Sequence, residues 1–178
     1  DHPVSVTGDF TGDIQNIPKW LILWLKDNFI TQKIITSKKT QKKIYIDRND
    51  MTSNNSSQRF IANENEVRGY LLKKGFIPVK LHDITFTEQV GIFNNAECIV
   101  GLHGGGFGNI IFCKPGTKVI ELRSSNAGPV IENLAKKNDL NYHSIIVEAQ
   151  QIHKFTYPNQ QGSLQIPITS LSKVLENY

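Results

Sequence analysis

The sequence contains little cysteine and no cluster of metal ligands. Its 178 residues include two cysteines, Cys98 and Cys113, and five histidines that are dispersed along the chain. Both cysteines lie in apolar surroundings without metal-ligand spacing, which excludes a disulfide framework and favours free, buried thiols in a reducing compartment. No pair of histidines has the spacing of a structural metal site. We therefore expect a cytoplasmic protein without a structural metal.

Long apolar runs and a basic stripe are also absent. The longest apolar run, residues 20–25, is far too short to span a bilayer, and no stretch resembles a signal peptide. The formal net charge is +4, but the lysines form scattered pairs without an aromatic ladder, a pattern typical of solvated faces. The sequence therefore predicts no transmembrane segment and no nucleic-acid partner, while its basic balance suits an anionic ligand.

The chain does contain short apolar stretches that alternate with helical patterns. Strands are expected at residues 43–48, 76–81, 98–102, 118–122 and 141–147. Helices are expected at residues 19–29, 63–74, 88–94, 106–113, 128–137 and 169–177, with Asn63 or Asn65 and Thr85 or Thr87 as N-caps. This alternation predicts an α/β domain with a mostly parallel sheet covered by helices on both faces. Residues 49–58 and 150–165 are expected to be loops.

The helix at residues 19–29 differs from the others because it is apolar nearly all round. Such a helix must be buried against something. The chain also starts at Asp1 without an initiator methionine, so we expect a preceding domain that this helix faces. We accordingly divide the chain into a connecting segment, residues 1–42, and a domain, residues 43–178.

The segment from Cys98 to Asn109 joins a predicted strand to a glycine cluster and then to a short apolar helix. Glycines let the backbone approach a ligand, and a following helix offers unpaired N–H groups to an anion. The segment fails the dinucleotide fingerprint because Asn109 stands where the third glycine is required, and no Gly-Lys-Ser/Thr follows. Its glycines are either a phosphate-binding turn or close packing of strand on helix.

His103 lies inside this segment, at the carboxyl end of the strand. Open α/β sheets bind ligands at the carboxyl ends of their strands. A histidine after four apolar residues is otherwise a structural residue with satisfied hydrogen bonds. Its position beside flexible glycines favours ligand contact.

Arginine is scarce in a chain that uses lysine freely, with four arginines among the 20 basic residues. Its planar guanidinium binds phosphate or carboxylate through two hydrogen bonds. Arg48 ends a predicted strand and Arg59 precedes a capped helix, so both are expected to reach the carboxyl-end crevice. Arg123 also ends a strand, whereas Arg68 lies in mid-helix and is expected to pair with Glu64 at the surface.

Three further polar residues are candidates for contact with hydroxyl groups. Glu88 and Gln89 open a predicted helix, where a carboxylate either compensates the helix dipole or binds a ribose or sugar hydroxyl. Glu121 lies in the apolar strand 118–122, and an acid there needs a partner or a function.

Six segments, taken together and in order, are more specific than any of these features alone: 45–48 (YIDR), 58–66 (QRFIANENE), 88–96 with Glu88, Gln89, Phe93 and Ala96, 99–109 (IVGLHGGGFGN), 115–116 (PG) and 119–122 (VIEL). This combination resembles glycosyltransferase family 61. The family usually has His-Gly-Ala-Gly-Leu-x-Asn at the glycine segment, where Gly105 and Phe107 replace the alanine and leucine. Neither change removes a polar group.

The resemblance implies a GT-B architecture, in which two Rossmann-like domains face each other across a cleft. This chain would be the C-terminal, donor-binding half, a three-layer domain with a mostly parallel sheet, and an N-terminal domain of comparable size would precede it. The implied chemistry is inverting transfer from a nucleotide sugar, commonly UDP-linked, to a hydroxyl of a glycan or other acceptor. The composition, heavy in Lys, Asn and Ile, favours a bacterial enzyme of polysaccharide or glycan synthesis.

The resemblance also implies site residues. His103 is the expected catalytic residue. The expected donor-binding residues are Arg48, Arg59, Asn63, Glu88, Gln89, Gly104, Gly105, Gly106, Asn109 and Glu121. No Asp-x-Asp triplet is present, so neither a metal nor another cofactor is expected. The general base has no candidate in this chain.

Two rival functions remain open at this point. A Rossmann-like domain can serve as a non-catalytic binding or assembly module, whose cleft is a recognition surface. A nucleotide-dependent oxidoreductase fits less well, because the dinucleotide fingerprint fails and no acid ends the second strand in the required register.

Overall fold

A computed structural model describes residues 17–30, 41–48, 59–150 and 162–176 of the protein. Its centre is a five-stranded sheet in the order β3-β1-β4-β5-β6, with every neighbouring pair parallel. The strands are β1 (Lys43–Ile46), β3 (Ile77–Val79), β4 (Cys98–Leu102), β5 (Lys118–Ser124) and β6 (Asn141–Val147). The predicted parallel α/β fold is therefore confirmed as Rossmann-like, and β4 and β6 have the predicted bounds.

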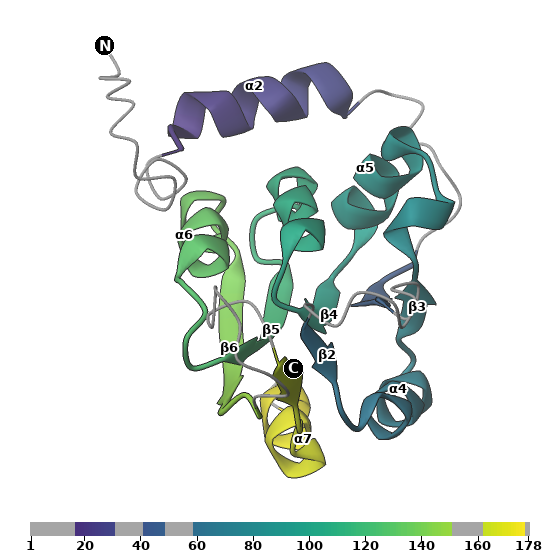
Figure 1. Ribbon diagram of the computed structural model, residues 1–178. Helices are drawn as coiled ribbons and strands as arrows, with labels where there is room; N and C mark the ends of the chain where they lie inside the picture. Colours follow the sequence, from purple (N-terminus) through teal and green to yellow (C-terminus); the bar gives the residue numbers. More distant parts are fainter. Residues whose placement is uncertain (1–16, 31–40, 49–58, 151–161, 177–178) are drawn as a thin grey trace.

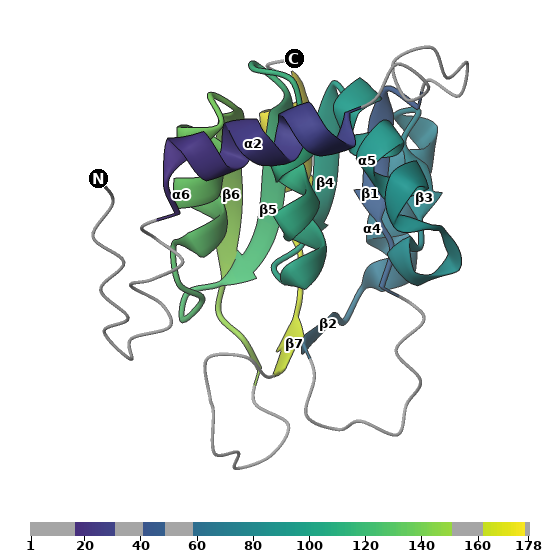
Figure 2. The same ribbon diagram turned by 90° about the horizontal axis from the view of Figure 1, so that it is seen from above.

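Helices cover both faces of this sheet, as Figures 1 and 2 show from two directions. One layer, above the sheet in Figure 1, contains α5 (Phe86–Asn95), η2 (Gly105–Phe112) and α6 (Val130–Lys137), and α2 (Lys19–Phe29) lies across the top of this layer. The other layer contains α4 (Glu64–Lys73) and α7 (Ile168–Glu176). A short 3-10 turn, η1 (Leu81–Asp83), follows β3. Among the described helices, none combines the length and apolar character that a membrane crossing requires.

The sheet order creates a switch point between β1 and β4. From β1 the chain moves outward to β3, then returns to the other side of β1 and continues through β4, β5 and β6. The connections after β1 and after β4 therefore leave in opposite directions, which opens a crevice at the carboxyl ends of these two strands. Arg48 follows β1 and His103 follows β4, so the topology brings both residues to this crevice.

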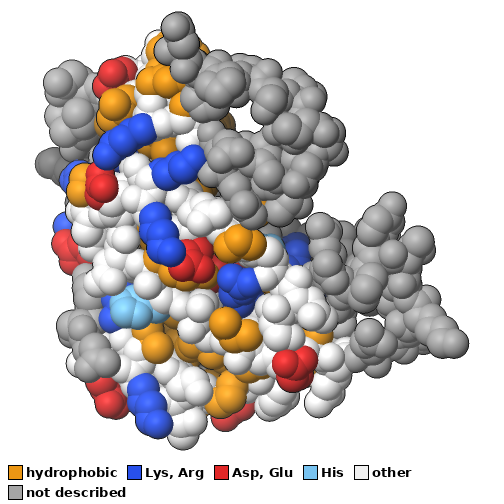
Figure 3. Space-filling model, turned by 90° about the vertical axis from the view of Figure 1, so that its left-hand side faces the viewer, with side chains coloured by type: hydrophobic (Ala, Val, Ile, Leu, Met, Phe, Trp, Pro, Cys, Tyr) orange, Lys and Arg blue, Asp and Glu red, His pale blue; other side chains and the backbone are white. Residues whose placement is uncertain are grey.

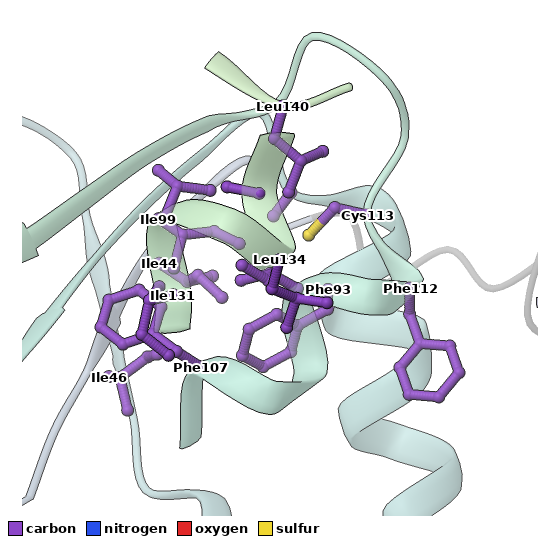
Figure 4. Close-up of a cluster of buried hydrophobic side chains, with 14 of the residues drawn as sticks. Ile44, Ile46, Phe93, Ile99, Phe107, Phe112, Cys113, Ile131, Leu134 and Leu140 are labelled. Carbon is purple, nitrogen blue, oxygen red and sulfur yellow. The ribbon is translucent and has the colours of Figure 1, made fainter. Parts of the chain in front are cut away.

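The core beneath the upper helical layer is a cluster of buried apolar side chains (Figure 4). Ile44, Ile99 and Val119 point to it from neighbouring strands, and Phe107 and Phe93 meet them from η2 and α5. A side chain at Gly101 would be crowded, because its Cβ would lie 3.1 Å from the Ile46 Cβ. Alternate strand residues therefore face this core and a second, equally apolar core on the opposite face, as expected for a parallel sheet buried on both sides.

Two buried asparagines hold the carboxyl end of η2 in place. Asn138 Nδ2 donates to the carbonyl oxygens of Ile110 at 2.7 Å and Ile111 at 3.1 Å, and Asn94 Nδ2 donates to Phe112 O at 3.0 Å. Terminal carbonyls of a buried helix need such partners. The glycine segment thus enters a helix that is fixed at its far end.

The α2 helix forms at the predicted residues but only one side of it is buried. Ile22 is 2% exposed and belongs to the upper core, whereas Trp20, Leu23 and Trp24 are each more than half exposed. Figure 2 shows α2 crossing over the neighbouring helical layer. The expectation that a preceding domain covers the remaining side stays a prediction.

Two short strands were not predicted. β2 (Arg59–Ile61) pairs in parallel with β7 (Gly162–Leu164), and Figure 2 shows this pair close to the point where the β5 arrow ends. The prediction of a loop over 150–165 is wrong for β7, since three-residue strands carry no periodicity and depend on their partner. The other predicted loop, residues 49–58, and residues 151–161 lie outside the described residues.

The surface beside α6 carries charges of both signs. Lys136 Nζ lies 2.6 Å from Glu132 Oε1 one turn away, and Lys19 Nζ lies 3.2 Å from Asp139 Oδ2. Figure 3 shows basic and acidic side chains interspersed on this side of the molecule. Such exposed pairs contribute little to stability.

Candidate functional site

The candidate site lies where the chain leaves β1 and β4, at the switch point. Arg48 Nη1 donates a 3.3 Å hydrogen bond to the carbonyl oxygen of His103, which joins the two strand ends. A Cβ at Gly104 would lie 2.8 Å from the same Nη1 atom. The absence of a side chain at residue 104 therefore makes room for the Arg48 guanidinium.

Gly106 and Gly105 differ in what an added side chain would contact. A Cβ at Gly106 would lie 2.9 Å from Leu81 Cδ1, so η1 packs closely there. At Gly105 an added Cβ would have no heavy atom within 4 Å. Close packing thus accounts for Gly104 and Gly106 but not for Gly105, which opens η2 at the predicted ligand position.

Glu121 is the most deeply buried charged group in the described part of the chain, with 0% of its side chain exposed. Its Oε1 is bonded to Nδ1 of His103, and its Oε2 accepts a hydrogen bond from the hydroxyl of Tyr142. The three residues come from β5, the end of β4 and β6. A carboxylate that is buried and already bonded through both oxygens influences a ligand through His103 rather than by direct contact.

The state of Tyr142 follows from this burial. Desolvation raises the pKa of the Tyr142 hydroxyl, and the hydrogen bond to Glu121 and its charge raise it further, against an opposing effect of Arg123. The Tyr142 hydroxyl therefore stays protonated at neutral pH and donates a hydrogen bond to the Glu121 carboxylate. Both carboxylate oxygens of Glu121 thus have a polar partner in the interior, as a buried charged group requires.

Arg59, the first residue of β2, brings a second guanidinium to this end of the sheet. Burial lowers the pKa of Arg59, the neighbouring charge of Arg48 lowers it further, and Glu121 opposes both effects. The Nη1 atom of Arg59 is buried without a hydrogen-bond partner in the described structure. Arg48 and Arg59 repel each other, and Arg59 has a donor without a hydrogen-bond acceptor in the described structure. Such a pair of guanidinium groups can bind an anion.

Arg123 lies on the same face of β5 as Glu121 but is bonded internally. Its Nη2 donates to the carbonyl oxygen of Ala127, and the side chain is buried. It faces the Tyr142 hydroxyl, whose pKa it lowers. Arg123 therefore contributes a positive charge next to Tyr142, while its own guanidinium is held by Ala127.

Glu88 has the structural role that the sequence offered as one of two alternatives. Thr85 caps α5, and Glu88 Oε2 accepts from the Thr85 backbone N at 2.8 Å while Thr85 Oγ1 accepts from the Glu88 backbone N at 3.3 Å. This reciprocal capping box uses the carboxylate that was expected to bind a hydroxyl. Of the two predicted caps, Thr85 is confirmed.

Gln89 and Asn109 also bond to their own chain. Gln89 Nε2 donates to Leu81 O at 2.8 Å, and Gln89 Oε1 accepts from Asn109 Nδ2 at 2.9 Å. The pair ties η1 to α5 and to η2. Both residues thus fix the loops around the glycine segment.

Asn63 holds the C-terminal part of the domain. Its Oδ1 accepts from the Ile166 backbone N at 2.9 Å, and its Nδ2 donates to Ile166 O at 2.9 Å and to Glu66 Oε2 at 2.8 Å. Residue 63 precedes α4 as its N-cap, but makes no side-chain cap bond. Its predicted contact with a donor stays a prediction that these bonds do not support.

The expected surface pair of Arg68 with Glu64 is wrong. Arg68 Nε lies 3.4 Å from Oδ2 of Asp47, whose side chain is 2% exposed, and Glu64 instead accepts from the Tyr45 hydroxyl at 2.7 and 2.8 Å. Helical spacing suggested the Glu64 pair, but Arg68 reaches across to the end of β1. Asp47 and Arg68 also line a pocket of about 340 Å³ at the β3 edge of the sheet, which none of the predicted site residues lines.

Tyr142 is the site residue that the sequence did not indicate. It sits in the predicted strand 141–147, but only the register, in which Tyr142 pairs with Val119, shows that its hydroxyl reaches Glu121. An aromatic residue in the strand beside a buried acid would have been the available signal. Among the described residues, no three His, Cys, Asp or Glu side chains are grouped so that they could hold a metal ion.

Comparison with models of known protein families gives a match. The family model described as Glycosyltransferase 61 matches residues 9–120, which is more than half of the chain. The matched range includes Arg48, Arg59 and the glycine segment. No curated protein gives a significant match.

The Glu64 carboxyl, near Asp47 and Arg68, allows a test of how burial affects a charged group beside β1. Burial raises the pKa of Glu64, and the nearby charge of Asp47 adds to this, although Tyr45 and Arg68 oppose it. A carboxyl with a raised folded-state pKa binds its proton more tightly when folded, so its contribution to stability is present at low pH and is lost as the pH rises through that pKa. We expect Glu64→Gln, which keeps an acceptor for Tyr45, to be more stable than the wild type at neutral pH.

Urea unfolding at about pH 4 and about pH 7, below and above the ordinary glutamate pKa of about 4.3, measures this. The advantage of Glu64→Gln should shrink at the lower pH. Glu66→Gln, in the same helical turn but exposed, serves as the control and should give no such gain, because it removes a favourable charge near a helix N-terminus. A Glu64→Gln variant less stable than the wild type at neutral pH would contradict the assignment.

Proposed function

The chain belongs to the glycosyltransferase 61 family, and on that premise we propose that this domain binds the nucleotide-sugar donor of an inverting glycosyltransferase. One observation supports the proposal most: the Arg48 guanidinium contacts the glycine segment at the switch point of the sheet, and Arg59 is near enough for its charge to interact with Arg48. Nucleotide sugars carry a diphosphate, which is the anion that such a pair binds well. We propose UDP as the nucleotide.

The proposed mechanism follows from the charge that develops during transfer. As the acceptor hydroxyl attacks the anomeric carbon, the bond to the diphosphate breaks and negative charge accumulates on the leaving phosphate. Groups that bind this charge more strongly than the ground state lower the barrier. Arg48, Arg59 and the backbone N–H groups near Gly105 would supply this stabilisation, and His103 would contact the diphosphate or the transferred sugar.

The proposal extends beyond this domain. From the family resemblance, we propose an N-terminal domain that completes the cleft, binds the acceptor and supplies the general base. The acceptor would be a hydroxyl of a glycan in bacterial polysaccharide or glycan synthesis, in the cytoplasm. The single domain alone would bind the donor without completing transfer.

Arg59→Ala tests the diphosphate site. We expect the variant to lose about 10- to 100-fold in affinity for UDP, because hydrogen bonds to charged groups contribute roughly 1.5–3 kcal/mol each. Isothermal titration calorimetry with UDP, UMP and uridine measures the loss and shows whether it depends on the second phosphate. Lys73→Ala removes the same charge from an exposed position in α4 and should bind UDP like the wild type.

Two outcomes would contradict the proposal. If Arg59→Ala binds UDP as tightly as the wild type, the guanidinium has no role in donor binding. If no uridine nucleotide binds the wild-type chain, a non-catalytic recognition or assembly module becomes the better description of the domain.

Gly105→Ala separates ligand approach from packing. An added Cβ meets no atom within 4 Å, so the variant should fold with unchanged or slightly higher thermal stability. If the backbone at residue 105 contacts the diphosphate, the methyl group should weaken UDP binding by about tenfold, roughly one hydrogen bond. Gly108→Ala, equally open in η2, is the control, and equal UDP affinity in the two variants would argue against contact at residue 105.

A further inference from the structure

His103 is held by one ring nitrogen, and within the described part of the chain the other nitrogen has no hydrogen-bond partner. Its Nδ1 is bonded to the buried carboxylate of Glu121. No described residue bonds to Nε2, and the side chain keeps 15% of its surface exposed. The ring is therefore fixed from behind while its second nitrogen remains available to a ligand.

Charged groups of both signs surround this histidine. On the negative side is Glu121 on β5, with the neutral Tyr142 hydroxyl of β6 bonded to it. On the positive side are Arg48 after β1, whose Nη1 bonds to the His103 carbonyl, and Arg59 on β2, whose charge interacts with Arg48 and Glu121. Arg123 on β5 lies behind Tyr142.

The net charge around the His103 ring differs between the site without an anion and the site with a bound diphosphate. Without an anion, two guanidiniums oppose a third positive charge on His103, and the single carboxylate of Glu121 favours it. A bound diphosphate adds at least two negative charges beside Arg48 and Arg59. Opposite charges at close range favour the charged form of a titrating group, so the balance moves toward the imidazolium.

We propose that His103 takes up a proton at Nε2 when a nucleotide diphosphate binds, and that Glu121 and Tyr142 are positioning residues that hold the imidazole for this purpose. The inference rests on the proposed function of this site. The proton comes from solvent, the Nδ1–H bond to Glu121 is kept, and the new Nε2–H donates to a phosphate oxygen. His103 then serves as a third cation beside the leaving diphosphate.

Glu121 and Tyr142 are suited to this role by their burial. The carboxylate cannot turn toward solvent, because the Tyr142 hydroxyl and the His103 ring occupy its two oxygens. A carboxylate at Nδ1 fixes the tautomer and ring orientation and stabilises the imidazolium when it forms. The sensitivity of His103 to a bound anion therefore depends on two residues that do not touch that anion.

Proton uptake can be counted by calorimetry. UDP and, separately, inorganic pyrophosphate are titrated into the chain at about pH 7.5, one unit above the ordinary pKa of histidine, in buffers with different ionisation enthalpies. The dependence of the binding heat on buffer enthalpy gives the number of protons taken up. We expect up to about one proton per bound molecule in the wild type.

Three variants assign that proton. His103→Gln should bind without this uptake, and Glu121→Gln, of equal size but without charge, should reduce it. His143→Gln, on β6 away from the site contacts described above, should leave the proton count as in the wild type. A merely structural role of Glu121 would change affinity or stability but not the number of protons.

Each result decides the inference. Buffer-independent binding of UDP to the wild type, or uptake that persists in His103→Gln, would overturn it while the proposed donor binding stands. Binding of pyrophosphate with His103-dependent uptake, but no binding of UDP, would support it and refute the proposed donor. If neither molecule binds, both the inference and the proposed function fail.

Discussion

The buried carboxylate of Glu121 is the interaction on which the site depends. An unpaired charge in the interior of a sheet costs several kcal/mol, so Glu121 must be hydrogen-bonded by its neighbours. Its partners come from both adjacent strands, His103 from the end of β4 and Tyr142 from β6. The carboxylate thereby fixes the histidine beside the glycine segment and places a negative charge within reach of Arg59.

The parallel order of the strands makes this arrangement possible. β4 and β5 are neighbours in register, with Gly101 opposite Glu121, so the residue after β4 reaches the acid on β5. β1 lies on the other side of β4 and delivers Arg48 to the same edge. Internal hydrogen bonds at the far end of η2 and around η1 hold the connecting loops to the rest of the domain.

The sequence predicted this fold well because its strands are continuous apolar runs separated by turn residues. It also predicted Arg48, Arg59, His103 and Glu121 as candidate site residues, and the structure places them at one end of the sheet; their role in a site stays a prediction. It did not indicate Tyr142, whose role depends on register. It also could not show that Glu88, Gln89 and Asn109 form hydrogen bonds within the domain. The same polar side chains serve for helix capping, for internal hydrogen bonds and for ligand binding. Their direct roles toward a donor remain predictions.

The central claim is that an anionic nucleotide binds at the switch point between β1 and β4. The most direct measurement is a titration of UDP into isotope-labelled protein, followed by the backbone amide signals and the arginine Nε signals in NMR spectra. If the nucleotide binds there, the largest shifts should occur at Gly104–Gly106, Arg48 and Arg59. Shifts confined to the β3-edge pocket, at residues such as Lys80 and Asp83, with the glycine segment unchanged, would contradict it.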